Sequence, residues 1–408
     1  MTRSAAFGFT IVVAISTSSA FAGPLRIATE PLSGDLSAAV LEFELRGLPE
    51  SRGVRLRRVP GGEEVPCQVT SRTSNGATIV WVARELKKDS ETAWEVDLIP
   101  AGAAGDRRVQ IKPDGENLDI NVEGKLFTRL VAERDAPRPY LFPIIGPGGV
   151  GMTRQFPMHA KVEGEDQDHP HHRSLWFTHG SVAGVDFWSE GSKTGRIRQT
   201  KVVATESGPV FGKIETRNEW ITPEGKKVLD DFRTLTFYPL ERGESFIDLN
   251  IVLTAADGDV VFGDTKEGSF GIRLAESMKE SRGGVIVNSA GQHGMKEAWG
   301  KPAEWVDYSG KVAGQQVGVA IFDHPSSFRH PTHWHVRDYG LFAANPFGYH
   351  DFYGDAAKNG SFTLEKGKSM TFHYRVFLHR GGAEDAKVRE AYRAFATAAR
   401  LRPKTDKA

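Results

Sequence analysis

The strongest constraint on the fold is a period of two in the apolar residues. Within residues 246–254, apolar side chains alternate with polar ones, at Ile247, Leu249, Ile251 and Leu253. A strand buried on one face produces this alternation, because successive side chains of a strand point to opposite sides. β-Branched and aromatic residues indicate two further strands at 77–83 and 372–377. Helix patterns are scarce, and the chain is therefore predicted to be all-β.

Turn signals separate these strand-like runs. Glu206–Pro209 and Pro223–Lys226 each carry the proline and glycine of a tight turn between two such runs. The 44 glycines among 408 residues exceed the usual share of about 7%. We expect a large antiparallel β-sandwich in which many short turns join neighbouring strands.

The histidines suggest how the chain divides into domains. Residues 23–113 contain no histidine, whereas all 13 histidines fall between His159 and His379. We predict a small N-terminal β domain at 23–113 and a large β-sandwich at 114–382 that carries the functional site.

A helix is predicted only at the C-terminal end, 383–408. Apolar residues recur there at helical spacing between lysines and arginines, at Val388, Tyr392, Phe395 and Ala399. This pattern is typical of an amphipathic helix, which we expect to span 383–401 and to pack on the sandwich. The tail from Arg402 onward is expected to be loose.

Residues 1–22 have the three parts of a secretory signal peptide. Arg3 gives the positive start, Ala5–Ile15 forms a short apolar core, and Ala20-Phe21-Ala22 resembles a cleavage site. The apolar core is shorter than the roughly 20 residues that span a bilayer. An uncleaved anchor or a buried helix is the alternative. We expect a periplasmic or secreted protein.

The composition argues against two classes of partner. Lysine plus arginine and aspartate plus glutamate number 52 each, so the formal charge is zero. A nucleic-acid-binding protein needs a basic face, and no later run is apolar enough to span a membrane. Cys67 is the only cysteine, and its apolar neighbours indicate a small buried side chain. The expected partner is a small-molecule or oligosaccharide substrate.

One cluster of titratable residues lies at Asp168–Trp176. Pro170 favours an extended backbone at His169, so His169 and His171 are predicted to share one face, with Asp168 and His172 on the other. Such a histidine pair can chelate a metal or bracket a substrate, and Arg173 can bind an anion. A surface loop of mutually tethered polar groups is the alternative.

A second cluster lies at His333–Tyr339. On a strand, His333, His335 and Arg337 share one face, and Trp334 and Val336 would enter the core. Asp338 follows, and Asn345 downstream is a candidate to orient a hydroxyl or a catalytic histidine. The alternative is an edge strand with solvated polar residues.

A third candidate is the segment Asp264–Gly268. Glu267 is a candidate general base, and Lys266 a candidate proton donor or anion-binding residue. A solvated charge run is the alternative. Aromatic residues are frequent around all three segments, among them Trp176, and a few exposed rings would stack on sugars.

The chain resembles a bacterial family usually labelled "methane oxygenase PmoA-like". The matching segments are Arg138–Tyr140, Asp168–Trp176, Gly184–Trp188, Asp264–Gly268, Trp305–Gly310 and Trp334–Gly348. The membrane-bound methane monooxygenase subunit of that name consists of membrane-spanning helices, which this chain lacks, so methane oxidation is not expected. In architecture the chain is more weakly similar to the galactose-mutarotase-like supersandwich. That resemblance implies a fold that hosts sugar epimerases, lyases and hydrolases.

These observations predict an exported carbohydrate-active enzyme that acts on a sugar or an oxidised sugar. Proton transfer is assigned to His169, His171, His172, His335 and Glu267, and substrate binding to Arg173, Lys266, Arg337, Asp338, Asn345 and Trp176. One divalent metal held by His169, His171 and His335 is a candidate cofactor. A non-catalytic glycan-binding protein and a redox metalloprotein are the alternatives. The prediction requires the two histidine clusters to meet in space.

Overall fold

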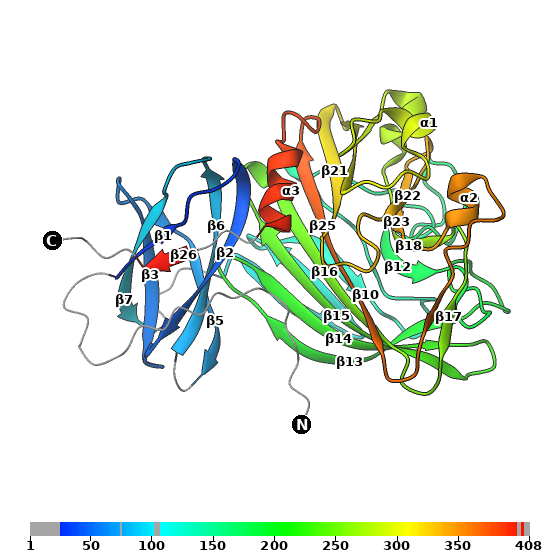
Figure 1. Cartoon of the computed structure of the whole chain (residues 1–408), viewed down its shortest axis with the longest axis horizontal. Coiled ribbons are helices and arrows are strands. Elements are labelled where there is room, and N and C mark those ends of the chain that lie inside the picture. The colour runs from blue at the N-terminus through cyan, green and yellow to red at the C-terminus, as the bar shows by residue number, and fades with distance from the viewer. Residues whose placement is uncertain (1–24, 74–75, 102–106, 398–400, 404–408) are drawn as a thin grey trace. The chain divides into compact units, whose positions relative to one another are not determined.

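The computed structural model describes residues 25–73, 76–101, 107–397 and 401–403, which form two compact units. One unit contains the described residues up to Arg108, Gly208–Val210 and the described residues from Glu390 on, and the other contains Val109–Ser207 and Phe211–Arg389. The segment predicted to be a signal peptide lies outside the described residues. The prediction of an all-β fold is confirmed, because strands make up far more of each unit than helices do (Figure 1).

The first unit is built from two small antiparallel sheets. One has the strand order β26-β1-β7-β3-β4 and the other the order β2-β6-β5. Their bounds are β1 Leu25–Thr29, β2 Leu36–Arg46, β3 Arg52–Val59, β4 Glu64–Val65, β5 Cys67–Thr73, β6 Gly76–Leu86, β7 Ala93–Pro100 and β26 Leu401–Pro403. Cys67 is buried in the core of this unit, and burial raises the pKa of its thiol to about 11.

The C-terminal residues depart from the prediction. Helix α3 covers Val388–Ala396 rather than 383–401, and Ala394 belongs to the core of the first unit, not to that of the sandwich. The segment predicted to be a loose tail begins inside β26, which pairs antiparallel with β1 at the edge of the first sheet.

The second unit is a sandwich of two eight-stranded sheets. One has the order β22-β23-β18-β12-β11-β10-β9-β8, and the other the order β13-β14-β15-β16-β25-β21-β20-β19. The first comprises β8 Val109–Asp114, β9 Asn117–Val122, β10 Lys125–Val131, β11 Tyr140–Leu141, β12 Leu175–His179, β18 Gly268–Arg273, β22 His333–Val336 and β23 Leu341–Asn345. The second comprises β13 Arg196–Glu206, β14 Gly212–Ile221, β15 Lys227–Pro239, β16 Ser245–Thr254, β19 Val285–Asn288, β20 Trp305–Val312, β21 Gln315–Asp323 and β25 Ser369–Arg380.

Short elements join these strands. They are the strand pair β17 Val260–Phe262 and β24 Phe362–Leu364, the helices α1 Gly294–Ala298 and α2 Tyr349–Tyr353, and the 3₁₀ turns Pro147–Gly149, Glu241–Gly243, Glu276–Met278 and Glu280–Arg282. Among the described residues, no helix has the length and apolar character needed to cross a membrane.

The core of the sandwich lies between its two sheets. The predicted alternation holds in β16, where all four apolar residues of the period-two pattern are buried. Rings from opposite sheets meet there: Phe177 lies 5.5 Å from Phe372 and Phe270 lies 4.9 Å from Tyr374, between centroids. Because strand side chains alternate, the intervening residues of β12, β18, β22 and β23 point to the other face of their sheet. Figure 1 shows these four strands next to α1 and α2.

Candidate functional site

The candidate site lies on the sheet that contains β12, β18, β22 and β23, on the face that points away from the sandwich core. Leu175 and Phe177 of β12 enter the core, whereas Trp176 between them lies in a separate apolar cluster on the opposite face. Strand register places four residues of that face in one row, Trp176, Gly271, Ala343 and His335. Arg273 and Arg337 lie two positions further along β18 and beyond the end of β22, so they project from the same face.

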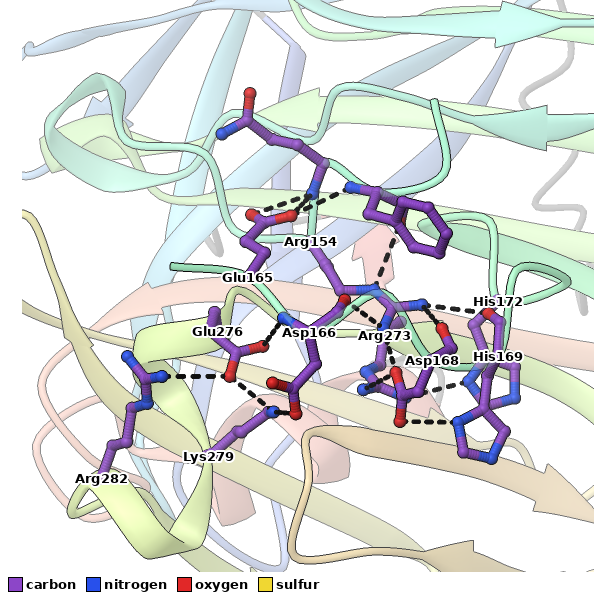
Figure 2. A network of polar contacts seen from close by, with 12 residues as sticks. Arg154, Glu165, Asp166, Asp168, His169, His172, Arg273, Glu276, Lys279 and Arg282 are labelled. Atoms are coloured by element: carbon purple, nitrogen blue, oxygen red, sulfur yellow. Dashed lines mark hydrogen bonds and ion pairs between the residues drawn. The ribbon is translucent and has the colours of Figure 1, made fainter. Parts of the chain in front are cut away.

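A carboxylate, Asp168, is held there between two buried arginines (Figure 2). Nη1 of Arg154 and Nη2 of Arg273 both donate to its Oδ1, the latter at 2.8 Å. Both arginine side chains are 0% exposed. Burial alone would raise the pKa of Asp168, but the charge of Arg273 and hydrogen bonds from His169 and Arg154 lower it to about 2. Asp168 is therefore a carboxylate at neutral pH.

This carboxylate orients His169. Nδ1 of His169 lies 2.7 Å from Oδ2 of Asp168, so in the neutral ring Nδ1 donates and Nε2 carries the lone pair. The ring stacks between His172 and Tyr339, with centroids 4.7 and 5.3 Å away. The backbone φ of His169 is 44°, in the left-handed region that residues other than glycine rarely adopt. Strained residues concentrate at functional sites, and the side chain of His169 is 39% exposed.

The two other histidines of this cluster differ from His169. His172 is 1% exposed, and its Nδ1 accepts a hydrogen bond from Nη1 of Arg273 at 3.1 Å. Burial holds its pKa well below the usual value, because the charged ring is disfavoured away from water. Burial, assisted by the charge of Arg138, also lowers the pKa of His171 to about 4. Both rings are neutral at neutral pH, and the ring of His172 stacks on that of His169.

The segment Asp264–Gly268 borders the same face, and three polar contacts fix its backbone. His335 Nδ1 donates to the carbonyl of Lys266 at 2.8 Å. Asn345 Nδ2 donates to the carbonyl of Thr265 at 2.9 Å, and the carboxylate of Asp351 accepts from the amide of Lys266 at 3.0 Å. The second histidine cluster therefore positions the loop that carries Glu267.

Glu267 is the acidic group of this loop. Its side chain is 38% exposed, and Nζ of Lys266 lies 3.8 Å from its Oε1. Burial raises the pKa of Glu267 above its usual value, while the charges of Lys266 and His169 act in the opposite direction.

Gly268, at the end of the loop, leaves no room for a side chain. A Cβ at this position would overlap Nδ1 of His179 and lie 3.4 Å from Nδ2 of Asn345. We expect Gly268→Ala to lower the free energy of unfolding by about 1–3 kcal/mol, the usual cost of overpacking. Urea denaturation measures this, with Gly258→Ala as the control, because nothing lies within 4 Å of that Cβ position. Equal stability of the two variants would contradict this packing.

Aromatic rings connect the two histidine clusters. The ring of Trp299 stands edge-on to His335, with centroids 4.9 Å apart. The guanidinium carbon of Arg337 lies 5.2 Å from the ring centroid of Trp299 and 5.5 Å from that of Tyr339. Tyr339 in turn stacks on His169. The segments around His169 and His335 therefore adjoin on one face of the sheet.

Comparison with known proteins places the chain in a family. Residues 117–393 match a family described as "Family of unknown function (DUF6807)", and this range covers more than half of the chain. The chain belongs to the DUF6807 family. The match includes every site residue discussed above. No curated protein sequence matches the chain.

Two solved structures are similar to this DUF6807 protein at low sequence identity. A glycosyl hydrolase family 38 protein from Enterococcus faecalis is 12% identical with a TM-score of 0.42, and the match covers 94% of this chain and 48% of that one. An α-mannosidase from Enterococcus faecalis V583 is 12% identical with a TM-score of 0.44, covering 94% of this chain and 46% of that one. The chain thus spans about half the length of these two proteins.

Three residues predicted to bind substrate have structural contacts in the DUF6807 fold instead. The two ends of the Arg173 guanidinium donate to Glu190, each at 2.8 Å, so this arginine is already paired. Trp176 is 2% exposed beneath His172, so it offers no surface on which a sugar could stack. Asn345 is 0% exposed and holds the loop at Thr265 rather than a catalytic histidine.

The metal site predicted from His169, His171 and His335 is not formed in the described part of this DUF6807 chain. No three histidine, cysteine, aspartate or glutamate side chains there come together in a way that could hold a metal ion. Nδ1 of His169 is committed to Asp168, and Nδ1 of His335 to the carbonyl of Lys266. His335 is 3% exposed, and burial lowers its pKa to about 3, so it positions the loop as a neutral ring.

Asp338 and Lys266 remain accessible. Asp338 is exposed, and its backbone carbonyl accepts a hydrogen bond from the hydroxyl of Tyr308 at 2.9 Å. The Lys266 side chain is 40% exposed, and its Nζ lies 3.8 Å from both Glu267 and Asp351. The charge of Lys266 is therefore shared between two carboxylates.

The sequence analysis missed the arginines that organise this face in the DUF6807 fold. Besides Arg154 and Arg273, Arg138 has a fully buried side chain that donates to the carbonyl groups of His171, Trp188 and Ser189. One signal was available, because Arg273 is a lone charge within the apolar run 268–275. An arginine buried in a strand has to be paired, so that position predicts a distant carboxylate.

Proposed function

We propose that this protein is a carbohydrate-active enzyme that moves protons on a sugar or an oxidised sugar. The observation that carries the proposal is the Asp168–His169 pair on the face of the sheet that the Glu267 loop borders. His169 has one nitrogen bound to a permanent carboxylate and the other without a partner among the described residues. Burial raises the pKa of Glu267, and His335 and Asn345 hold the loop that carries it at this face. Groups tuned in this way cluster at catalytic sites.

In this proposal His169 is the general base and Glu267 the general acid. The unbound Nε2 of His169 accepts a proton from the substrate, and Asp168 stabilises the imidazolium that results. The raised pKa of Glu267 keeps its carboxyl group protonated at higher pH than an ordinary glutamate, so it can donate a proton. Epimerisation, β-elimination and glycoside hydrolysis each use one such pair. Export, predicted from residues 1–22, is part of the proposal.

The test is a search for a product. The purified protein is incubated with neutral aldoses, uronates and oligosaccharides in deuterated water, and proton NMR records exchange at carbon, unsaturation and new reducing ends. Any of these three signals supports the proposal if a boiled control does not give it. Binding of a sugar without a product after long incubation would favour the glycan-binding alternative. For this alternative, the rings of Trp299 and Tyr339 beside Arg337 are the available stacking surface.

Glu267→Gln is expected to lower turnover by about 10²-fold, because glutamine cannot donate the proton. In the native enzyme the active form of Glu267 is protonated, so turnover should fall as pH rises through its raised pKa. That fall should vanish in the variant. The pH profile of kcat measures both effects. Glu365→Gln, at an exposed position, is the control. If kcat of Glu267→Gln still fell at high pH as it does in the native enzyme, Glu267 would not be the general acid.

A further inference from the structure

Arg337 differs from the other arginines of this face because it has no anionic partner. Arg154 and Arg273 share Asp168, and Arg173 is paired with Glu190. Among the described residues, the side chain of Arg337 makes neither a hydrogen bond nor an ion pair, and its Nε is buried without an acceptor. A buried donor that lacks an acceptor costs free energy. A ligand cannot reach Nε itself, but the residue is only half-buried, so a ligand can supply acceptors to the terminal Nη groups.

Two aromatic rings hold the guanidinium group of Arg337 in place. Its carbon lies 5.2 Å from the ring centroid of Trp299 and 5.5 Å from that of Tyr339. Such contacts engage the flat faces of the group and leave its edges able to donate to two oxygens at once. Tyr339 also links this group to the proposed reaction centre, because the same ring stacks on His169.

We propose that the substrate is an acidic sugar whose carboxylate binds Arg337, an inference that rests on the proposed function. A guanidinium fork matches the two oxygens of a planar carboxylate. A phosphate or sulfate usually collects several cations or backbone amides, whereas the neighbouring cation Lys266 is shared between Glu267 and Asp351. A single unpaired arginine therefore favours a carboxylate with one negative charge.

A carboxylate at Arg337 would also activate the substrate. The C–H bond on the adjacent carbon breaks, its proton passes to Nε2 of His169, and its electron pair moves into the carboxylate as an enolate that faces Arg337. Glu267 then donates a proton to the other face of that carbon, which gives the epimer. Alternatively, a C=C bond forms, the C–O bond at the next carbon breaks, and Glu267 protonates the departing oxygen.

Calorimetric titration of the whole protein tests the binding step without requiring turnover. The probes are glucuronate and galacturonate, glucose and galactose as their neutral counterparts, and inorganic phosphate. We expect at least one acid to bind about tenfold more tightly than its neutral counterpart, and phosphate to bind no better than the neutral sugars. Arg337→Gln should abolish the preference, and Arg337→Lys should restore part of it. Arg198→Gln, at an exposed position in β13, should leave it unchanged.

The outcomes separate this inference from the proposed function. An equal response to acidic and neutral sugars, a preference that survives in Arg337→Gln, or tight phosphate binding would each overturn the inference. Because His169→Ala leaves Arg337 in place, this variant should still prefer the acid. Retained preference with no product from any sugar would sustain carboxylate binding and end the catalytic proposal. Turnover of neutral sugars that is unaffected in Arg337→Gln would sustain the catalytic proposal and end the inference of carboxylate binding.

Discussion

His169→Ala is expected to lower turnover by about 10³- to 10⁴-fold, the upper part of the range for the loss of a general base. The loss should be large because Asp168, Arg154 and Arg273 together hold this one ring in position. No neighbouring imidazole can replace it: burial lowers the pKa of His171 to about 4 and that of His172 well below its usual value. Steady-state kinetics with the substrate found in the NMR search measures the effect.

Two comparisons distinguish a catalytic from a structural role for His169. His293→Ala removes an exposed histidine elsewhere on the same unit and should leave turnover unchanged. The melting temperature of His169→Ala should stay close to that of the native protein, because the side chain is 39% exposed. A large fall in melting temperature, or turnover close to the native value, would mean that His169 does not act as the base.

His379→Ala is expected to lower the free energy of unfolding by about 3–5 kcal/mol, the usual effect of removing one partner from a buried ion pair. Nε2 of His379 on β25 lies 2.6 Å from Oδ2 of Asp307 on β20, and both side chains are 0% exposed. Without the imidazole, Asp307 would be left as an isolated charge inside the sandwich. Urea denaturation at neutral pH measures the change. His373→Ala, on the same strand but in no ion pair within the described part of the chain, should cost less.

The same pair should make stability depend on pH. Burial alone would lower the pKa of His379, but the charge of Asp307 and its hydrogen bond raise it above the usual value. The folded protein therefore holds this proton more tightly than the unfolded chain does. The stabilisation is fully present below the unfolded pKa of about 6.5 and is lost as pH rises through the folded pKa. In His379→Gln this decline should disappear, whereas a decline of the same size would assign it to another group.

Local patterns in the sequence were sufficient to predict much of the sandwich. The alternation at 246–254 predicted a strand with one buried face, and β16 pairs without a bulge to β15 and β25. β26 could not be predicted in this way, because an edge strand of three residues is defined by its partner β1 rather than by its own composition. For the same reason the first unit gained a strand that the sequence analysis had placed in a loose tail.

The candidate site was predictable where its residues are consecutive and unpredictable where they meet only in space. The cluster around His169 was visible in the sequence, and the structure places it beside the cluster around His335. The roles within the clusters depend on partners that are distant along the chain. Arg173 is neutralised by Glu190, whereas Asp168 is held by Arg154 and Arg273. Which arginine remains available to a ligand is therefore decided by tertiary pairing, and no local pattern singles out Arg337.

The pairing of β26 with β1 has a consequence for synthesis. The ribosome makes Leu401–Pro403 long after β1, yet these residues close the edge of a sheet whose other strands come from the first hundred residues. The N-terminal unit consequently stays one strand short, with an unpaired edge, until Leu401–Pro403 has been made. Unpaired edges invite pairing with other chains, so this interval is when a nascent copy is most exposed to self-association.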